Sequence, residues 1–253
     1  MLKIKIDSYK INNNFSISGI NLRIKNGEIF SLIGRSGSGK SSLAKIMVGK
    51  TPFTDFELNI NGKEIFKEGL MKFYDEFGYV PQSLIFNPHH TVLEFLKYVY
   101  QFEKIPIQEK KIQKAIKEFK LKSLLNTKIQ SLSGGERQKL AILEVVSRPI
   151  ECLVLDEPFS QLDPGQKKEL SSLIIHLVKD LNIPCLLISH EMGDVLKWSD
   201  RIGIMHNGKI VGQGNIEKLI ESKNPIVQSK IIEMVQWYEE IIPLINKLNN
   251  FSK

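Results

Sequence analysis

The chain has 253 residues, of which 42% are hydrophobic and 25% charged, and its formal net charge is +7 at pH 7. A chain of this length and ordinary composition can bury one substantial core in water, and its longest apolar stretches fall well short of the roughly 20 residues that a helix needs to cross a bilayer. The chain is therefore not predicted to form a membrane pore. Its lysines are scattered without a long basic tract, so no nucleic-acid partner is expected.

The N-terminal segment, residues 1–7, alternates between apolar and polar side chains. This alternation is typical of a β-strand and differs from the continuous apolar stretch of a secretory signal, so the protein is expected to stay in the cytoplasm. Asn-Gly pairs favour the positive backbone angles of tight hairpins. They occur at residues 26–27, 61–62 and 207–208, and antiparallel β structure is therefore predicted both early and late in the chain.

A glycine-rich loop follows the apolar run of residues 28–33 and precedes a helical pattern that starts at Leu43. Its sequence, GRSGSGKSS, matches the P-loop pattern in the strand-to-helix context that a P-loop requires. The glycines let successive backbone N–H groups point inward, and the helix N-terminus adds partial positive charge, so the loop is suited to hold a phosphate chain. The predicted phosphate ligands are Gly34, Arg35, Ser36, Gly37, Ser38, Gly39, Lys40, Ser41 and Ser42.

Three side chains of this loop have separate predicted tasks. Lys40 supplies a mobile cation for the β and γ phosphates, and the Ser41 hydroxyl is placed to coordinate Mg²⁺. Ser42 is suited to donate a hydrogen bond to an α or β phosphate oxygen. The sequence therefore predicts a site for a nucleoside triphosphate with Mg²⁺.

Residues 91–129 show a helical pattern of apolar side chains, and a Lys/Glu-rich amphipathic segment lies within them at residues 108–119. The apolar residues that recur there at helical spacing are Val92, Leu93, Phe95, Leu96 and Val99. An α-helical subdomain is predicted to be inserted at about residues 83–147. Its polar face is either a binding surface or a solvated helix face, and the second interpretation is the commoner one.

Apolar runs at residues 28–33, 152–155 and 185–189 alternate with helical stretches. This order favours parallel strands with helices packed on them, and hence an α/β core. The two cysteines, Cys152 and Cys185, lie inside these runs. Buried reduced thiols are expected there, in preference to a disulfide or a metal site.

Two acidic residues follow the run of residues 152–155, at Asp156 and Glu157. The carboxyl end of a parallel strand is where ligands bind in open α/β sheets. Asp156 is suited to hold Mg²⁺, directly or through water, and Glu157 is suited to orient and deprotonate an attacking water. Such a pair can also merely cap the next element, but the P-loop upstream favours the catalytic interpretation.

Residues 132–138 read LSGGERQ, which resembles the signature sequence of ATP-binding-cassette (ABC) ATPases. A chance match to seven named residues has odds on the order of 10⁻⁸ per position at average composition. The resemblance continues at Gln82 with the Q-loop of that family, at residues 160–163 with its D-loop and at His190 with its switch histidine. It implies a P-loop NTPase (RecA-like) core with an N-terminal antiparallel β subdomain and an inserted α-helical subdomain.

The resemblance also implies how the site works. In the family two nucleotide-binding domains face each other head to tail, and each ATP lies between the P-loop of one and the signature of the other. His190 is expected to contact the γ-phosphate and hold the water with Glu157, while Gln82 is expected to touch Mg²⁺ or water. The residues expected to serve the nucleotide of the partner domain are Ser133, Gly134, Gly135, Glu136 and Asp163.

An aromatic residue of the N-terminal β subdomain is expected to stack on the adenine. Tyr9 is the first choice for this role, and Phe15 is the rival. A third interpretation is that the ring is an ordinary strand aromatic.

Residues 82–92 resemble the segment of importer ATPases that forms a groove for a short helix of the permease. The resemblance therefore implies the ATPase subunit of an ABC transporter, peripheral on the inner face of the cell membrane and paired with membrane permease subunits and a second nucleotide-binding subunit. We expect an ATPase domain over residues 1–224 and a helical extension over residues 225–253. The alternatives are a non-transport ABC ATPase, of the cluster-assembly or cell-division type, and a nucleotide-binding scaffold without turnover.

Overall fold

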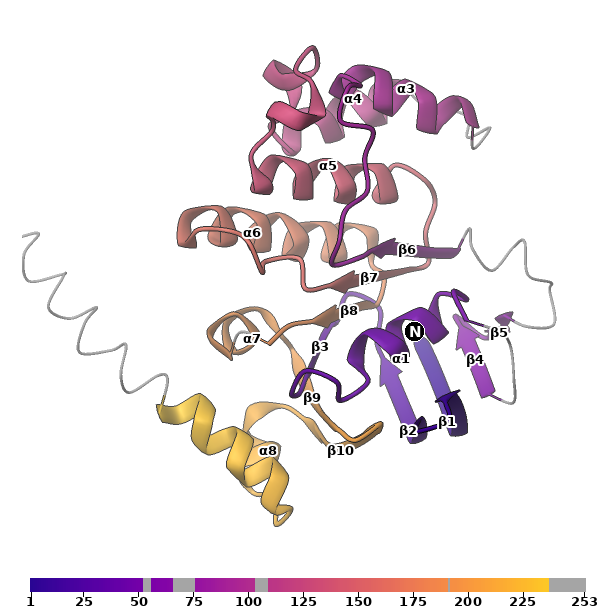
Figure 1. Cartoon of the computed structure of the whole chain (residues 1–253), viewed down its shortest axis with the longest axis vertical. Coiled ribbons are helices and arrows are strands. Elements are labelled where there is room, and N and C mark those ends of the chain that lie inside the picture. The colour runs from indigo at the N-terminus through magenta and orange to yellow at the C-terminus, as the bar shows by residue number, and fades with distance from the viewer. Residues whose placement is uncertain (52–55, 66–75, 103–108, 191, 237–253) are drawn as a thin grey trace, which may run out of the picture.

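The computed structural model describes residues 1–51, 56–65, 76–102, 109–190 and 192–236, and Figure 1 shows the arrangement of these elements. A four-stranded antiparallel sheet has the order β2-β1-β4-β5. Its strands are β1 (Leu2–Asn12), β2 (Phe15–Ile24), β4 (Phe56–Ile60) and β5 (Lys63–Glu64). The first strand alternates between buried and exposed residues from Leu2 to Ile6, as the sequence pattern predicts. The predicted N-terminal antiparallel sheet is confirmed.

A second, six-stranded sheet has the order β10-β9-β3-β8-β7-β6. Its strands are β3 (Ile29–Ile33), β6 (Phe77–Val80), β7 (Cys152–Asp156), β8 (Cys185–Ile188), β9 (Arg201–His206) and β10 (Lys209–Gly214). All pairs are parallel except β10 with β9. Every residue of β3, β7 and β8 is buried, because packed layers cover both faces of these central strands.

One layer contains the antiparallel sheet and α1 (Lys40–Met47), which cover the face of the large sheet that carries Phe30, Val154 and Leu186. The opposite face, with Leu153, Leu155 and Leu187, packs against α5 (Gly134–Val146) and α6 (Pro164–Leu181). Beyond α5 lie α3 (Val92–Phe102) and α4 (Glu109–Glu118), at the top of Figure 1. The α/β core and the helical region are thus as predicted, whereas the exact bounds of the inserted subdomain stay a prediction.

The C-terminal part of the described chain packs at the end of the large sheet formed by β9 and β10. It contains α7 (Met192–Trp198), α8 (Ile216–Ile220) and a helix at residues 225–236. This last helix packs through Val227, Ile231 and Met234 on a small core that includes Ile202 and Ile204. Residues 225–236 of the predicted extension are thus helical, residues 237–253 lie outside the described residues, and the division of the chain into a domain and an extension stays a prediction.

Two of the three predicted Asn-Gly hairpins form, one between β4 and β5 and one between β9 and β10. The third prediction is wrong, because residues 26–27 join β2 of one sheet to β3 of the other and pair no two neighbouring strands. Cys152 and Cys185 are free and fully buried on opposite faces of the large sheet, in agreement with the expected reduced thiols. None of the helices in the described part of the chain has the length and apolar character needed to span a membrane.

Candidate functional site

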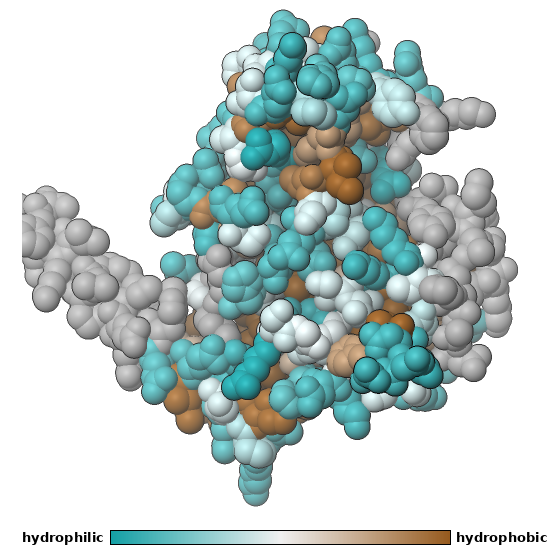
Figure 2. All heavy atoms as spheres, in the orientation of Figure 1, coloured by the Kyte–Doolittle hydropathy of each residue, from teal (hydrophilic) through white to brown (hydrophobic). Residues whose placement is uncertain are grey.

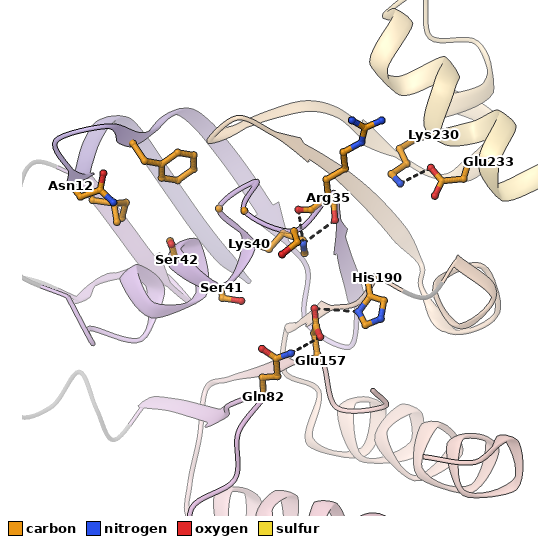
Figure 3. Close-up of a pocket in the computed structure, with 16 residues that line it drawn as sticks. Asn12, Arg35, Lys40, Ser41, Ser42, Gln82, Glu157, His190, Lys230 and Glu233 are labelled. Carbon is orange, nitrogen blue, oxygen red and sulfur yellow. Dashed lines mark hydrogen bonds and ion pairs between the residues drawn. The ribbon is translucent and has the colours of Figure 1, made fainter. Parts of the chain in front are cut away.

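A cavity of about 690 Å³ opens at the carboxyl ends of the central strands (Figure 3). It brings together residues from six parts of the chain: the β1–β2 turn, the P-loop, the segments after β6, β7 and β8, and the C-terminal helix. The lining residues are Ile11, Asn12, Phe15, Gly34, Arg35, Ser36, Gly37, Gly39, Lys40, Ser41, Ser42, Gln82, Glu157, His190, Lys230 and Glu233. All the predicted phosphate ligands line it except Ser38, which is buried.

The P-loop has the backbone that its glycines permit. Gly37 and Gly39 have φ angles of 78° and 107°, in the left-handed region that other residues rarely adopt. A Cβ at Gly34 would lie 2.3 Å from the backbone oxygen of Met205, so only glycine lets the loop pass β9 this closely. α1 then begins at Lys40, directly after the loop, and its N-terminus adds partial positive charge to the phosphate site.

The ammonium group of Lys40 is held by the loop itself. Its Nζ donates hydrogen bonds to the backbone oxygens of Gly34 (2.9 Å) and Arg35 (3.1 Å). Burial lowers the pKa of Lys40 because the charged form loses water, and the carboxylates of Glu157 and Asp156 oppose this shift. A phosphate anion entering the loop would supply the counter-charge that the carbonyl oxygens supply only in part.

Asp156 and Ser41 form an oxygen pair at the end of β7. The Ser41 hydroxyl donates to Asp156 Oδ1 at 3.1 Å, and the Tyr79 hydroxyl lies 3.5 Å from Oδ2. Burial raises the pKa of Asp156, while its hydrogen bond with Ser41 opposes the shift. The described residues contain no group of three or more His, Cys, Asp or Glu side chains that could by itself hold a metal ion. The donor set nevertheless fits Mg²⁺, which is usually bound by one or two carboxylates together with substrate phosphates.

Glu157 is the centre of a three-residue group (Figure 3). Its carboxylate accepts a hydrogen bond from Gln82 Nε2 at 2.8 Å and lies 3.2 Å from His190 Nδ1. Gln82 follows β6, Glu157 follows β7 and His190 follows β8, and these three strands are neighbours in the sheet. The structure thus places Gln82 and His190 in contact with the Glu157 carboxylate between them, beside the P-loop.

The signature segment does not line the cavity of its own chain. Ser133 caps α5: its hydroxyl accepts from Glu136 N at 3.3 Å, while the Glu136 carboxylate accepts from Ser133 N at 2.7 Å. Asp163 caps α6 through its side chain, whose Oδ1 accepts from Gly165 N and Gln166 N. The capping box of α5 and the side-chain cap of α6 fix two helix N-termini. The expected role of Ser133, Gly134, Gly135, Glu136 and Asp163 toward the nucleotide of a partner stays a prediction.

The structure contradicts the choice of Tyr9 as the adenine-stacking residue. Its side chain is only 4% exposed and packs edge-on against Phe56, away from the cavity. The alternation of β1 breaks at Asp7 and Ser8, which are both exposed, and this break turns Tyr9 into the core. The rival residue, Phe15, lines the cavity.

Four lining residues were not predicted from the sequence: Ile11, Asn12, Lys230 and Glu233. The first two are within four positions of Phe15, so the choice of Phe15 would have pointed to them. No local motif marks Lys230 or Glu233, which reach the cavity only through the packing of the C-terminal helix.

Comparisons with known proteins agree with this geometry. The family model described as ABC transporter matches residues 17–160, more than half of the chain. A probable sulfate/thiosulfate import ATP-binding protein, CysA, of Chlorella vulgaris is 30% identical over 81% of this chain and 86% of its own length. A putative ABC transporter ATP-binding protein of Pyrococcus abyssi is 33% identical over 88% of this chain and 83% of its own.

Among solved structures, cbiO1 of Clostridium perfringens, described as part of the ABC transporter complex cbiONQ, superposes with a TM-score of 0.79 at 26% identity, covering 98% of each chain. The signature, the P-loop and the acids after β7 are thus found in the fold that the family uses. The chain belongs to the ABC transporter family, as one of its ATP-binding ATPase subunits.

Proposed function

We propose that this chain binds ATP with Mg²⁺ and hydrolyses it to drive solute transport through a separate membrane permease, working with a second nucleotide-binding subunit. The observation that carries the proposal is the convergence of Gln82, Glu157 and His190 beside the P-loop in one cavity. Binding alone would need the loop but would not need a carboxylate placed between an amide and an imidazole.

Each group in the cavity has a task in this proposal. The backbone N–H groups of the loop and the Lys40 ammonium hold the phosphates, and Ser41, Asp156 and the Gln82 amide oxygen hold Mg²⁺. The metal ion, when bound, neutralises charge on the phosphate oxygens. Glu157 accepts the proton of the attacking water, and His190 keeps the carboxylate oriented through its Nδ1. Phe15 stacks on the adenine at the opposite end of the cavity.

A groove on the outer surface supports the proposal that a permease is the partner of this chain. It has a volume of about 350 Å³ and lies between the end of β6 and α5, with Leu84, Ile85, Glu144 and Arg148 among its lining residues. Ile85 is 92% exposed, although a large apolar side chain is usually covered. Figure 2 shows apolar surface over the segment that leads from β6 toward α3. We propose that a short permease helix occupies this groove, which places the subunit on the inner face of the membrane.

The catalytic part is tested by measuring phosphate release from ATP with Mg²⁺ and with EDTA. The parent protein is expected to turn over only with Mg²⁺. Glu157→Gln is expected to bind ATP and lose about 10²- to 10⁴-fold in turnover, the usual contribution of a general base. Lys40→Ala is expected to lose tight ATP binding, and Glu221→Gln, an exposed carboxylate outside the cavity, serves as the matched control. Parent-like turnover by Glu157→Gln would refute the base assignment.

The assembly part is tested separately. With ATP bound, Glu157→Gln is expected to accumulate as a dimer in size-exclusion chromatography, because both subunits contact the unhydrolysed γ-phosphate. Tagged protein purified from gently solubilised membranes is expected to bring a multi-span protein with it. A variant that stays monomeric with ATP, alone and with its membrane partner, contradicts the shared-nucleotide arrangement. Recovery without any membrane protein contradicts the transport role.

A further inference from the structure

The C-terminal helix at residues 225–236 forms one wall of the nucleotide cavity. Val227, Ile231 and Met234 fix the helix to the core beside β9, so that Lys230 and Glu233 line the cavity. A second hollow of about 250 Å³ lies between this helix and the start of the P-loop, with Arg35 and Lys230 among the residues of its wall. The helix is therefore in direct reach of the phosphate site.

Lys230 is a largely buried cation in this wall, and it is paired with a carboxylate. Its side chain is only 14% exposed, and its Nζ lies 2.6 Å from Oε2 of Glu233, whose side chain is 57% exposed. Burial is the main cause that lowers the pKa of Lys40, and the positive charge of Lys230 adds to it, which indicates that the two ammonium groups are electrostatic neighbours. Lys230 thus has a carboxylate partner on one side and the phosphate site on the other.

The two ends of the cavity are distinguished by their residues (Figure 3). Asn12 and Phe15 mark the base end, whereas Glu157 and His190 mark the end where the terminal phosphate is cleaved. In Figure 3 Lys230 and Glu233 lie beyond Arg35, on the same side of the cavity as His190 and far from Asn12. A nucleotide bound with its base at Phe15 would direct its terminal phosphate toward Lys230.

We propose that Lys230 is an additional binding residue for the terminal phosphate, with Glu233 as its counter-ion when that phosphate is absent. ATP draws the ammonium from Glu233 to the phosphate oxygens, and ADP leaves the Lys230–Glu233 pair intact. The C-terminal helix thereby distinguishes the two nucleotides. This inference rests on the proposed ATPase function. It adds to that function a phosphate contact from a residue that belongs neither to the P-loop, nor to the acidic pair at residues 156–157, nor to the signature segment.

The test compares dissociation constants for the non-hydrolysable ATP analogue AMP-PNP and for ADP, both with Mg²⁺. Lys230→Met keeps the apolar stem and removes the charge, and it is expected to weaken AMP-PNP binding about ten-fold, or about 1.4 kcal/mol, while ADP binding changes little. Lys230→Arg is expected to restore most of the affinity, because it keeps a charged donor. Lys223→Met, an exposed lysine that does not line the cavity, is the charge-matched control.

Equal weakening of AMP-PNP and ADP by Lys230→Met would overturn the inference, because a merely structural role of the helix affects both nucleotides. Glu233→Gln provides an independent arm should Lys230→Met fail to fold. Removing the competing carboxylate is expected to tighten AMP-PNP binding and leave ADP binding unchanged. Weaker or unchanged AMP-PNP binding would contradict the exchange.

The two proposals fail in different ways. In one outcome the parent protein binds and hydrolyses ATP, while Lys230→Met keeps the parent's ratio of AMP-PNP to ADP affinity. That result would refute only the role of Lys230. A parent protein that binds neither nucleotide refutes both.

Discussion

The turn between β9 and β10 connects the P-loop to the antiparallel sheet, and Gly208→Ala tests that connection. Gly208 N donates to the backbone oxygen of Ser38 at 2.9 Å, and Gly208 O accepts from Ser18 N at 3.0 Å. Gly208 has a φ of +77°, and a Cβ there would lie 2.0 Å from the backbone oxygen of Ser16. A side chain at this position therefore strains its own backbone and pushes against a strand that has little room to move.

The expected cost has two parts. Placing alanine at a positive φ costs roughly 1–2 kcal/mol, and forcing an extra carbon into a closely packed contact costs about 1–3 kcal/mol more. Gly62→Ala isolates the first part: Gly62 also follows asparagine in a hairpin, with a φ of +89°, but a Cβ there would meet nothing within 4 Å. We therefore expect Gly208→Ala to lose about 2–5 kcal/mol of unfolding free energy and Gly62→Ala about 1–2 kcal/mol.

Urea denaturation followed by circular dichroism measures both losses, and ATP titration measures the effect on the loop. Gly208→Ala is expected to weaken ATP binding because displacement of Gly208 N moves the hydrogen-bond partner of Ser38. Gly62→Ala is expected to bind ATP like the parent, since Gly62 does not line the cavity. Equal losses of unfolding free energy in the two variants would show that the close contact with Ser16 adds nothing to the cost of the substitution.

Two further predictions concern the cavity. Burial raises the pKa of Asp156, so the folded state holds its proton more tightly than the unfolded chain, and the stability contributed by this group falls as pH rises through the raised pKa. Asp156→Asn is therefore expected to raise the melting temperature of the nucleotide-free protein in EDTA at neutral pH but not at acidic pH. The same variant is expected to lose Mg²⁺-dependent turnover. A lower melting temperature than that of the parent at neutral pH would contradict the expected effect of burial. Phe15→Ala is expected to weaken ATP binding by about 1–3 kcal/mol, the usual worth of base stacking, whereas Tyr9→Phe should leave the dissociation constant unchanged, and the reverse order would restore Tyr9 as the stacking residue.

The parts of the site that the sequence predicts well are those whose geometry is local. The loop from Gly34 to Ser42 combines a strand, glycines and a helix start within a few residues, so its shape follows from nearby chemistry. Asp156 and Glu157 are similar, because the apolar run of residues 152–155 leads directly into them. Neither prediction needs knowledge of which strands become neighbours.

The meeting of Gln82, Glu157 and His190 does need that knowledge. The first two are 75 positions apart in sequence, and they meet because β6, β7 and β8 lie side by side and end at the same edge. Strand order is set by the packing of the whole sheet, so residue patterns alone cannot specify it. The resemblance to the ABC family implied that these side chains serve one site, but it gave no order for the strands.

Two failures have related physical causes. Tyr9 was misplaced because β1 loses its alternation at Asp7 and Ser8, where two exposed residues follow each other. Lys230 was missed because its approach to the P-loop depends on Val227 and Ile231 docking beside β9, far away in sequence. In both cases packing decided which way a side chain faces: the polar pair at residues 7–8 is a local sign of the change at Tyr9, whereas no local motif marks Lys230.

The backbone at Glu157 shows what the site requires of the fold. Glu157 has a φ of +52°, a left-handed conformation that is uncommon for a residue other than glycine. Its N–H still donates to the backbone oxygen of Ile188 at 2.9 Å, so pairing with β8 continues through the strained position. Strain of this kind costs on the order of 1–3 kcal/mol and persists only where surrounding contacts enforce it. The strained residue is the one whose carboxylate contacts Gln82 and His190. The strain at Glu157 is therefore part of the candidate catalytic arrangement.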